Sequence, residues 1–381
     1  MFNENFMKKI SQRDEILLER AFSTLKNNII TKPENDAAFV FGDLRGIVPS
    51  PSTYKGVWNW DGAFHMIAAS YFDKKLAEDQ AEILFSHMSE DGQLPDVIYT
   101  NGQSVTRFTK PPVIGWTMMC SDKISPDIDF LKKWYPHVAK NIQWWENNRS
   151  DGTLFFYDVS KMESGWDNTV RFDFPHRINH CYAVDLNCFM ADYYLAASYM
   201  AEKQELENDR QNYLKKREKL AKNINEILFC KGKGYYCDYN FKLKRFTNRL
   251  SPASFMPLFS GIADSEKAKA MKLLAESPEY FYKGMPTISY NNRRYNSAKY
   301  WRGPCWLNTA YFAVRGLYDY GYSELAMEYI ENILGWCYKN SESIYEYYDS
   351  KSSKGLGAEN FGWSSVFIIE MILLKYGENI I

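Results

Sequence analysis

The sequence is poor in histidine, carries no excess of charge of either sign, and has no long apolar run. It has five histidines, and 46 basic residues against 47 acidic ones leave a formal net charge of -1. This balance gives no support for a nucleic-acid or acidic-membrane partner. No apolar run reaches 18 residues, and residues 1–5 lack a basic stretch followed by an apolar one. We therefore expect a soluble, cytoplasmic protein.

The seven cysteines are odd in number and include no Cys-x-x-Cys pair. We expect structural thiols in a reducing compartment. His176 and His180 form the only close histidine pair, and at i,i+4 they would share one face of a helix. No acid–histidine pattern typical of a zinc hydrolase surrounds them. The sequence therefore predicts neither a metal nor a cofactor.

Alternation of strand and helix patterns is also missing, which argues against a doubly wound α/β fold. Apolar stripes with helical spacing dominate instead. They run through 14–30, 74–88, 128–145, 185–203, 220–228, 307–317, 325–337 and 363–375, with weaker ones at 61–72, 111–119 and 264–275. No Pro/Ser-rich linker divides the chain, so we expect one domain over residues 1–381.

Paired helices joined by loops rich in Trp and carboxylates favour an all-α toroid over a solenoid, because a toroid brings its loops together at one end. Two short β-prone runs, at 234–239 and 243–247, bracket a turn at 240–242. They predict one small β-hairpin inserted in the helical fold.

Carboxylates and aromatic rings gather in four segments of the chain. These are Trp58–His65, Glu163–Arg171, Tyr300–Asn308 and Glu346–Ser365. Hydrolysis of a glycosidic bond needs one carboxylic acid to protonate the leaving oxygen and a second carboxylate as base or nucleophile. Aromatic rings supply flat faces for sugar rings.

Three of these segments also have a structural interpretation. Asp61 fits the N-cap of a helix, and the run from Glu163 to Arg171 fits a polar turn between helices. Arg302 fits a helix cap or the partner of a core acid, and about half of the 63 aromatic residues fit a large core.

The four segments, in this order, resemble those of glycoside hydrolase family 63, in particular its bacterial mannosylglycerate hydrolase-like branch, and more distantly those of trehalases. The resemblance runs from Trp58 to Trp363, and the segments Ser251–Leu258 and Gly284–Thr287 add to it. It implies an all-α, (α/α)6-barrel fold and a hydrolase that inverts the anomeric configuration.

By this resemblance, Asp167 is the general acid and Glu346 the general base, with Glu359 as the rival base. Arg171 resembles the arginine that follows the acid in trehalases, and Arg302 belongs to the Trp-Arg-Gly-Pro segment that lines the pocket. The predicted substrate-binding residues are Trp58, Trp60, Asp61, Gln93, Glu163, Trp166, Arg171, Trp301, Arg302, Trp306, Asn308 and Trp363.

The predicted function is an inverting, exo-acting α-glycosidase for a small α-glucoside or α-mannoside, such as glucosyl- or mannosylglycerate or a short disaccharide. A charged aglycone needs a cation, and the candidates are Arg107, Lys110, Arg171 and Arg293. The alternatives are a trehalase, although its Gln-Trp-Asp segment and Gly-rich run are missing, a sugar epimerase with paired histidines, and a non-catalytic carbohydrate-binding helical protein. The oligomeric state stays open.

Overall fold

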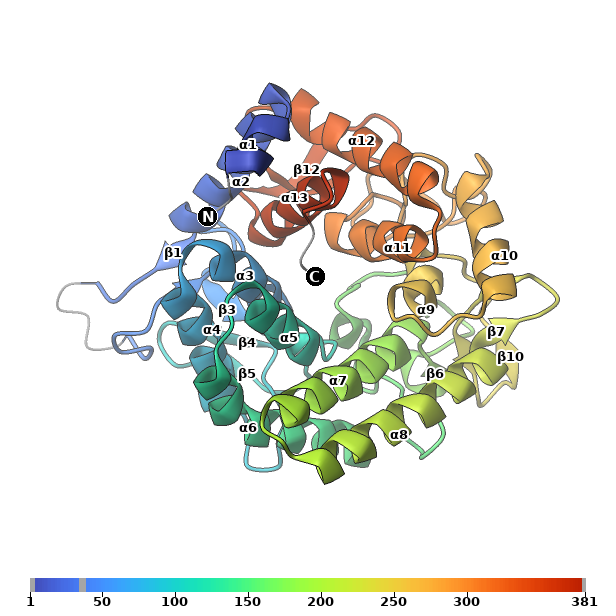
Figure 1. Cartoon of the computed structure of the whole chain (residues 1–381). Helices are drawn as coiled ribbons and strands as arrows, with labels where there is room; N and C mark the ends of the chain where they lie inside the picture. Colours follow the sequence, from blue (N-terminus) through green and yellow to red (C-terminus); the bar gives the residue numbers. More distant parts are fainter. Residues whose placement is uncertain (1–3, 34–38, 379–381) are drawn as a thin grey trace. The chain divides into compact units, whose positions relative to one another are not determined.

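The computed structural model describes residues 4–33 and 39–378 (Figure 1). Residues 1–3, which carry part of the argument against a leader sequence, lie outside them. The chain forms two compact units. Unit 1 comprises 1–148, 192–215 and 358–381, and unit 2 comprises 149–191 and 216–357.

Unit 1 is built around two helices, α3 and α13, that are buried on all sides and are mostly apolar. α3 is buried from Asn59 to Ser70, and α13 is buried from Gly362 to Leu374. α3 packs against α4, α5 and α13, and α13 also packs against α2. The helices of unit 1 are α1 (Glu4–Lys9), α2 (Gln12–Asn27), α3 (Asn59–Phe72), α4 (Lys74–Ser86), α5 (Ile114–Ile124), α6 (Ile128–Asn148) and α13 (Gly362–Lys375). α2, α4 and α6 are amphipathic and form outer layers, whereas a helix that is apolar all round belongs inside.

Unit 2 repeats this principle around α11, which is buried over most of its length. α11 packs against α9, against the 3₁₀ helix Pro252–Phe255 and against the amphipathic α12. Its helices are α9 (Met256–Phe259), α10 (Ser265–Glu276), α11 (Leu307–Asp319) and α12 (Ser323–Lys339). α7 (Val184–Lys203) and α8 (Glu207–Asn223) have residues in both units, and a π-helical turn, Ile224–Leu228, follows α8. Each predicted stripe contains a helix, although residues 28–30, 87–88 and 111–113 lie outside the helices and 29–30 form β1. α1 and α9 are short helices that the periodicity did not reveal.

Short strands pair within the segments that connect the helices. In unit 1 they are β1 (Ile29–Ile30) with β2 (Gly46–Ile47), and β3 (Gly56–Trp58) with β4 (Val97–Tyr99) and β5 (Ser104–Val105). In unit 2, β6 (Cys181–Tyr182), β9 (Tyr239–Asn240) and β10 (Arg245–Phe246) form one sheet, and β7 (Phe229–Cys230) with β8 (Tyr235–Tyr236) another. β11 (Tyr345–Tyr348) pairs with β12 (Gly355–Glu359).

The predicted hairpin is confirmed in part. β9 pairs with β10 around the expected turn, in the register Tyr239 opposite Phe246. β8, however, pairs with β7, the strand that precedes it in the sequence. The first predicted strand therefore consists of two short strands, β8 and β9. The pairing partner changes between the two strands: the Cys237 N–H donates to the Leu228 carbonyl oxygen, whereas the Asp238 carbonyl oxygen accepts the Thr247 N–H, both at 2.8 Å.

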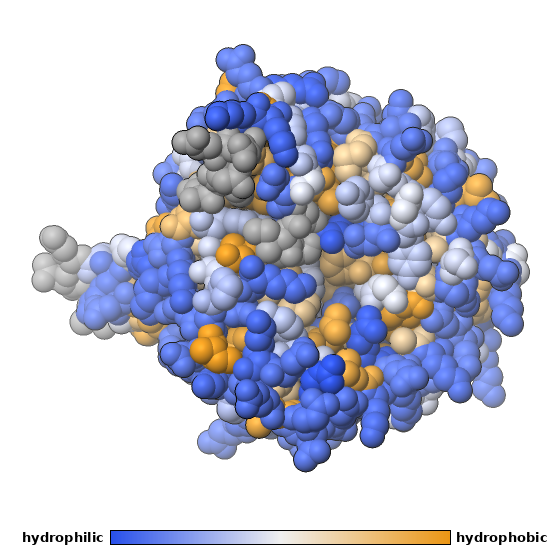
Figure 2. All heavy atoms as spheres, in the orientation of Figure 1, coloured by the Kyte–Doolittle hydropathy of each residue, from blue (hydrophilic) through white to orange (hydrophobic). Residues whose placement is uncertain are grey.

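Hydrophilic residues predominate on the face of the molecule that Figure 2 shows, and the apolar residues on it are scattered. Within the described residues, no helix is both long and apolar enough to cross a membrane.

Candidate active site

Asp167 lies in a tight turn that follows a 3₁₀ helix, Lys161–Ser164. The 3₁₀ helix ends at Gly165, whose φ of 75° is the left-handed conformation that glycine adopts without strain. The next turn closes when the Thr169 N–H donates to the carbonyl oxygen of Trp166 at 2.9 Å. This places the Asp167 side chain at the tip of the turn, where it is half-buried, while Trp166 points inward.

Glu346 lies on β11, where buried and half-buried side chains alternate. Its side chain is 4% exposed, and the Tyr300 hydroxyl donates to its Oε1 at 3.3 Å. On β12, Gly357 comes so close that a Cβ there would stand 2.4 Å from Glu346 Oε2. The φ of Gly357 is also positive, at +78°. A side chain at position 357 would therefore displace the Glu346 carboxylate.

The two carboxylates are borne by segments that one column of stacked rings connects. Trp166 stacks on Trp301 with centroids 5.3 Å apart, Trp301 on Trp306 at 3.8 Å, and Trp306 on Tyr347 at 4.7 Å. The interplanar angles are 21°, 9° and 19°. Because Trp166 precedes Asp167 and Tyr347 follows Glu346, the column fixes both backbone segments to the Tyr300–Asn308 segment.

Asn168 adds a second link between the acid's loop and the segment that carries the central rings. Its side-chain oxygen accepts the Trp301 backbone N–H at 2.9 Å, and its carbonyl oxygen accepts Arg302 Nη1 at 2.9 Å. Arg302 also pairs with Asp173 at 2.7 Å. Arg302 therefore positions the loop of Asp167 through a bond to the backbone of Asn168.

Asp173 gathers three cations below this loop: Arg302, Lys161 at 2.5 Å and Arg294 at 3.2 Å. Burial on its own would raise the pKa of Asp173. The hydrogen bonds from Arg302 and Lys161 outweigh it and hold the pKa below its usual value.

Two residues of this loop that the sequence predicts as substrate contacts are buried in ion pairs. Arg171 is fully buried and forms paired hydrogen bonds to Asp185, at 2.5 and 2.8 Å, and to Asp238, at 2.9 and 2.7 Å. Its guanidinium lies 5.0 Å from the centroid of the Trp166 ring. Glu163 is likewise fully buried, and its Oε1 accepts two bonds from Arg149, at 3.1 and 2.9 Å. Both are structural ions, held by partners far away in the sequence.

The two central rings of the column, Trp301 and Trp306, are also predicted substrate-binding residues, and both are buried. Trp301 has Trp166 on one side and Trp306 on the other, and Trp306 has Trp301 and Tyr347, so both faces of each ring are covered. Asn308 is fully buried in the first turn of α11, and its Nδ2 has no partner among the described residues. Tyr347, which the sequence analysis missed, ends the column with a half-buried ring.

Unit 1 holds the remaining predicted substrate contacts. Trp60 and Trp363 lie together, with centroids 6.0 Å apart, although they are 303 positions apart in sequence (363 minus 60). Asp61 is not an N-cap: Trp58 takes that position, and Asp61 follows in the first turn of α3, where the helix dipole favours a carboxylate. Trp58 is half-buried, edge-on to Tyr54 and Tyr99. Gln93 donates to the carbonyl oxygen of Thr106.

The candidate cations for a charged aglycone have separate surroundings. Lys110 pairs with Asp96 at 3.4 Å in a buried position, Arg107 is exposed, and Arg293 is exposed in unit 2. His176 and His180 do not share a helix face, because only Ile178–His180 is helical, as a single 3₁₀ turn. Glu359 is exposed at the end of β12.

Comparison with known proteins gives one family over most of the chain. The mannosylglycerate hydrolase MGH1-like glycoside hydrolase domain matches residues 54–364. The mannosylglycerate hydrolase of Rubrobacter radiotolerans is 30% identical over 160 residues, a match that covers 41% of this chain and 36% of that enzyme. The mannosylglycerate hydrolase of Thermus thermophilus is 22% identical over 401 residues, which covers 84% of this chain and 95% of that enzyme.

A solved structure shows the same fold. A family 63 mannosylglycerate hydrolase from a strain of Thermus thermophilus, in complex with Tris and D-glycerate, superposes with a TM-score of 0.79 at 20% identity. The superposition covers 93% of this chain and 99% of that one. The predicted resemblance and the predicted (α/α)6-barrel fold class are therefore confirmed.

Proposed function

Because the chain belongs to the mannosylglycerate hydrolase MGH1-like glycoside hydrolase family, we propose that it is an inverting α-glycosidase for a small α-mannoside or α-glucoside. Mannosylglycerate and glucosylglycerate are the first substrates to test, and trehalose is the alternative. Asp167 acts as the general acid and Glu346 as the general base. The observation that carries the proposal is the ring column, which ties the segments of these two carboxylates into one frame.

Asp167 suits the role of the acid because the arginine of its own loop is engaged elsewhere. Arg171 would oppose this role if its guanidinium were not paired with other carboxylates, because a nearby positive charge favours the ionised form of Asp167. Arg171 is instead neutralised by Asp185 and Asp238, and the Trp166 ring covers it. Arg171 therefore does not oppose the proposed role of Asp167 as the proton donor to the leaving oxygen.

Glu346 suits the role of the base because its surroundings hold the carboxylate in place. The Tyr300 hydroxyl donates to Oε1, and Gly357, which has no side chain, leaves the space beside Oε2 that a Cβ would fill. Tyr300 has a φ of 43°, a conformation that non-glycine residues adopt where the surroundings impose it. The half-buried ring of Tyr347, next to the base, offers a face for the sugar.

In the proposed reaction, Asp167 donates its proton to the glycosidic oxygen as the bond to the anomeric carbon breaks. Glu346 takes a proton from a water molecule, which attacks the anomeric carbon from the opposite face. Inversion requires the two carboxyl groups to be about 6.5–9.5 Å apart so that the water fits. The first product of an α-glycoside is then the β-sugar.

The test combines a substrate panel with two variants. Hydrolysis of mannosylglycerate, glucosylglycerate, trehalose and aryl α-glycosides is measured, and proton NMR identifies the anomer that appears first. We expect Glu346→Gln to abolish turnover, whereas Glu359→Gln, which alters an exposed carboxylate, retains it. Early release of the α-anomer, or loss of activity only in the Glu359 variant, would refute this assignment of the base.

A further inference from the structure

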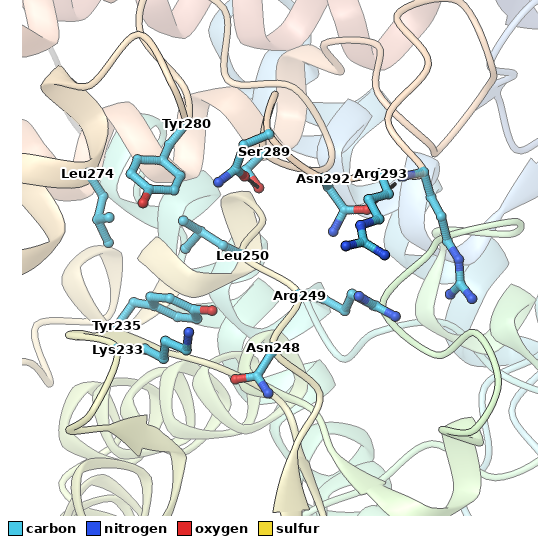
Figure 3. Close-up of a pocket in the computed structure, with 12 residues that line it drawn as sticks. Lys233, Tyr235, Asn248, Arg249, Leu250, Leu274, Tyr280, Ser289, Asn292 and Arg293 are labelled. Atoms are coloured by element: carbon cyan, nitrogen blue, oxygen red, sulfur yellow. Dashed lines mark hydrogen bonds between the residues drawn. The ribbon is translucent and has the colours of Figure 1, made fainter.

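Unit 2 contains a hollow that the proposed hydrolysis does not use. Its volume is about 550 Å³, and it lies between the β7–β8 turn, the segment after β10, and the segment 280–294 that follows α10 (Figure 3). Twelve described residues line it, and neither Asp167, Glu346 nor any ring of the column is among them. Its volume suits a ligand the size of a monosaccharide or disaccharide.

The lining is strongly basic. It includes Lys233, Arg249, Arg293 and Arg294, and none of its twelve residues carries a carboxylate. Arg294 pairs with Asp173, but the other three cations form no ion pair with any residue that the structure describes. Figure 3 shows the guanidinium ends of Arg249 and Arg293 on the same side of the pocket. Uncompensated cations around a hollow favour a bound anion.

Arg249 makes this argument more specific. Its Nε is buried and has no hydrogen-bond partner in the described part of the chain. Burial, together with the positive charge of Arg294, lowers the pKa of Arg249. A buried donor without a partner destabilises the folded protein, and more so when it is charged. A ligand anion that accepts from this guanidinium removes that cost.

The rest of the lining fits a polyhydroxylated ligand. Asn248, Asn292 and Ser289 offer hydrogen-bonding groups, whereas Tyr235 and Tyr280 offer rings with polar tips. Sugars present the same combination of hydroxyl groups and apolar C–H faces.

The wall that carries Ser289 and Asn292 is held in position by its own hydrogen bonds. The Ser289 N–H donates to the Leu250 carbonyl oxygen at 3.0 Å, and the Asn292 N–H to the Ser289 carbonyl oxygen at 3.0 Å. Asn292 Oδ1 in turn accepts the Arg294 N–H at 2.9 Å. Glu279 is the acidic residue nearest in sequence to this wall. It is exposed, and its carboxylate accepts a hydrogen bond from the Asn291 side chain at 2.9 Å. The site therefore needs little rearrangement to bind.

We propose that this pocket is a second binding site, separate from the site of hydrolysis, for a sugar-sized molecule that carries a phosphate or carboxylate group. The charge selects the anion, and the amides, hydroxyl and tyrosines select the polyol.

The test measures binding by calorimetry to full-length Asp167→Asn protein, in which hydrolysis is removed. The probes are glucose 6-phosphate, glucuronate, inorganic phosphate and glucose. We expect the phosphorylated sugar or the sugar acid to bind, and the better of the two identifies the anionic group. Glucose should neither bind there nor displace the anion, and added salt should weaken binding.

Arg249→Gln and Arg293→Gln should each weaken binding at least about tenfold, which corresponds to the loss of one charge-assisted hydrogen bond. Lys231→Gln is the matched control. Lys231 is an exposed cation of the β7–β8 turn, which also carries Lys233, but Lys231 does not line the pocket. Thermal unfolding confirms that the variants fold; Arg293 is exposed, so its replacement leaves the core intact.

Absence of binding by either anionic sugar overturns the proposal, as does binding that neither arginine variant weakens. Displacement of the anion by a non-hydrolysed glycoside substrate would place it in the site of hydrolysis and overturn the claim of a separate site. Binding is read without turnover, so these outcomes leave the proposed hydrolysis untouched.

Discussion

Two sets of charged residues in unit 2 lie close together in the sequence and have opposite surroundings. Glu163 and Arg171, at the ends of one loop, are fully buried and completely engaged by partners. Asp167, in the middle of the same loop, is half-buried at the tip of a turn. The outer charges of the loop therefore form a buried frame, and the carboxyl group that we propose as the acid lies between them at a less buried position. Preorganised groups of this kind need a rigid frame to act at a fixed position.

The largest effect should come from the central carboxyl. Asp167→Asn removes the proposed proton donor, and kcat should fall by about 10²–10⁴. The free energy of unfolding should change little, because the side chain is half-exposed and asparagine has the same shape. Turnover within tenfold of the wild type, measured with mannosylglycerate or the best substrate of the panel, would show that another residue is the acid.

Replacement of Arg171, one of the buried charges of the frame, should reduce the stability of the protein. Arg171→Met leaves the carboxylates of Asp185 and Asp238 buried without their cation, so the free energy of unfolding should fall by about 3–5 kcal/mol. Denaturant unfolding measures this loss. Arg171→Lys is the control, which retains the charge but not the paired geometry and should cost less. A variant that keeps its stability but binds substrate weakly would restore Arg171 as a substrate contact.

Asp173 should show an intermediate effect that depends on pH. Asp173→Asn weakens the bonds to Arg302, Lys161 and Arg294, at a cost of about 1–3 kcal/mol, near the lower limit because the side chain is partly exposed. The folded-state pKa of Asp173 is depressed, so its contribution is complete above the ordinary carboxyl pKa and is lost as the pH falls through the folded-state value.

Thermal unfolding between pH 7 and pH 3 tests this sign. The difference between wild type and Asp173→Asn should be largest near pH 7 and should shrink toward pH 3. A difference that grows on acidification would contradict the role given to this carboxylate.

The smallest effect concerns the end of the ring column. Tyr347→Ala removes the half-buried ring next to Glu346, and KM should rise about tenfold, a change of about 1.4 kcal/mol. Tyr347→Phe keeps the ring and should keep KM within about threefold. Burial and then the charge of Glu346 raise the pKa of the Tyr347 hydroxyl, so it stays protonated and its loss in phenylalanine should not alter the pH profile. Equal effects of both variants would mean that the hydroxyl, not the ring, binds.

The sequence predicted the helices and the four motif segments because these depend on neighbouring residues. Apolar spacing indicated α3, α11 and α13, and the order of motifs indicated the family. It did not predict which charges would be buried. Arg171 meets Asp185 and Asp238, 14 and 67 positions away, and no local pattern shows that they converge.

The aromatic residues show the same difference between what the sequence predicts and what only the folded chain shows. Composition and motif order showed that tryptophans accompany the carboxylates, which sufficed for the class of enzyme. Only the folded chain shows that Trp301 and Trp306 stack on each other between Trp166 and Tyr347. It also shows that Gly357 lies so close to the Glu346 carboxylate that no side chain would fit there. The sequence by itself determined the helical fold and the chemistry of the segments, because periodicity and motifs are local. The tertiary structure decided which side chains are frame and which are open, because burial and ion pairing depend on contacts between segments far apart in the chain.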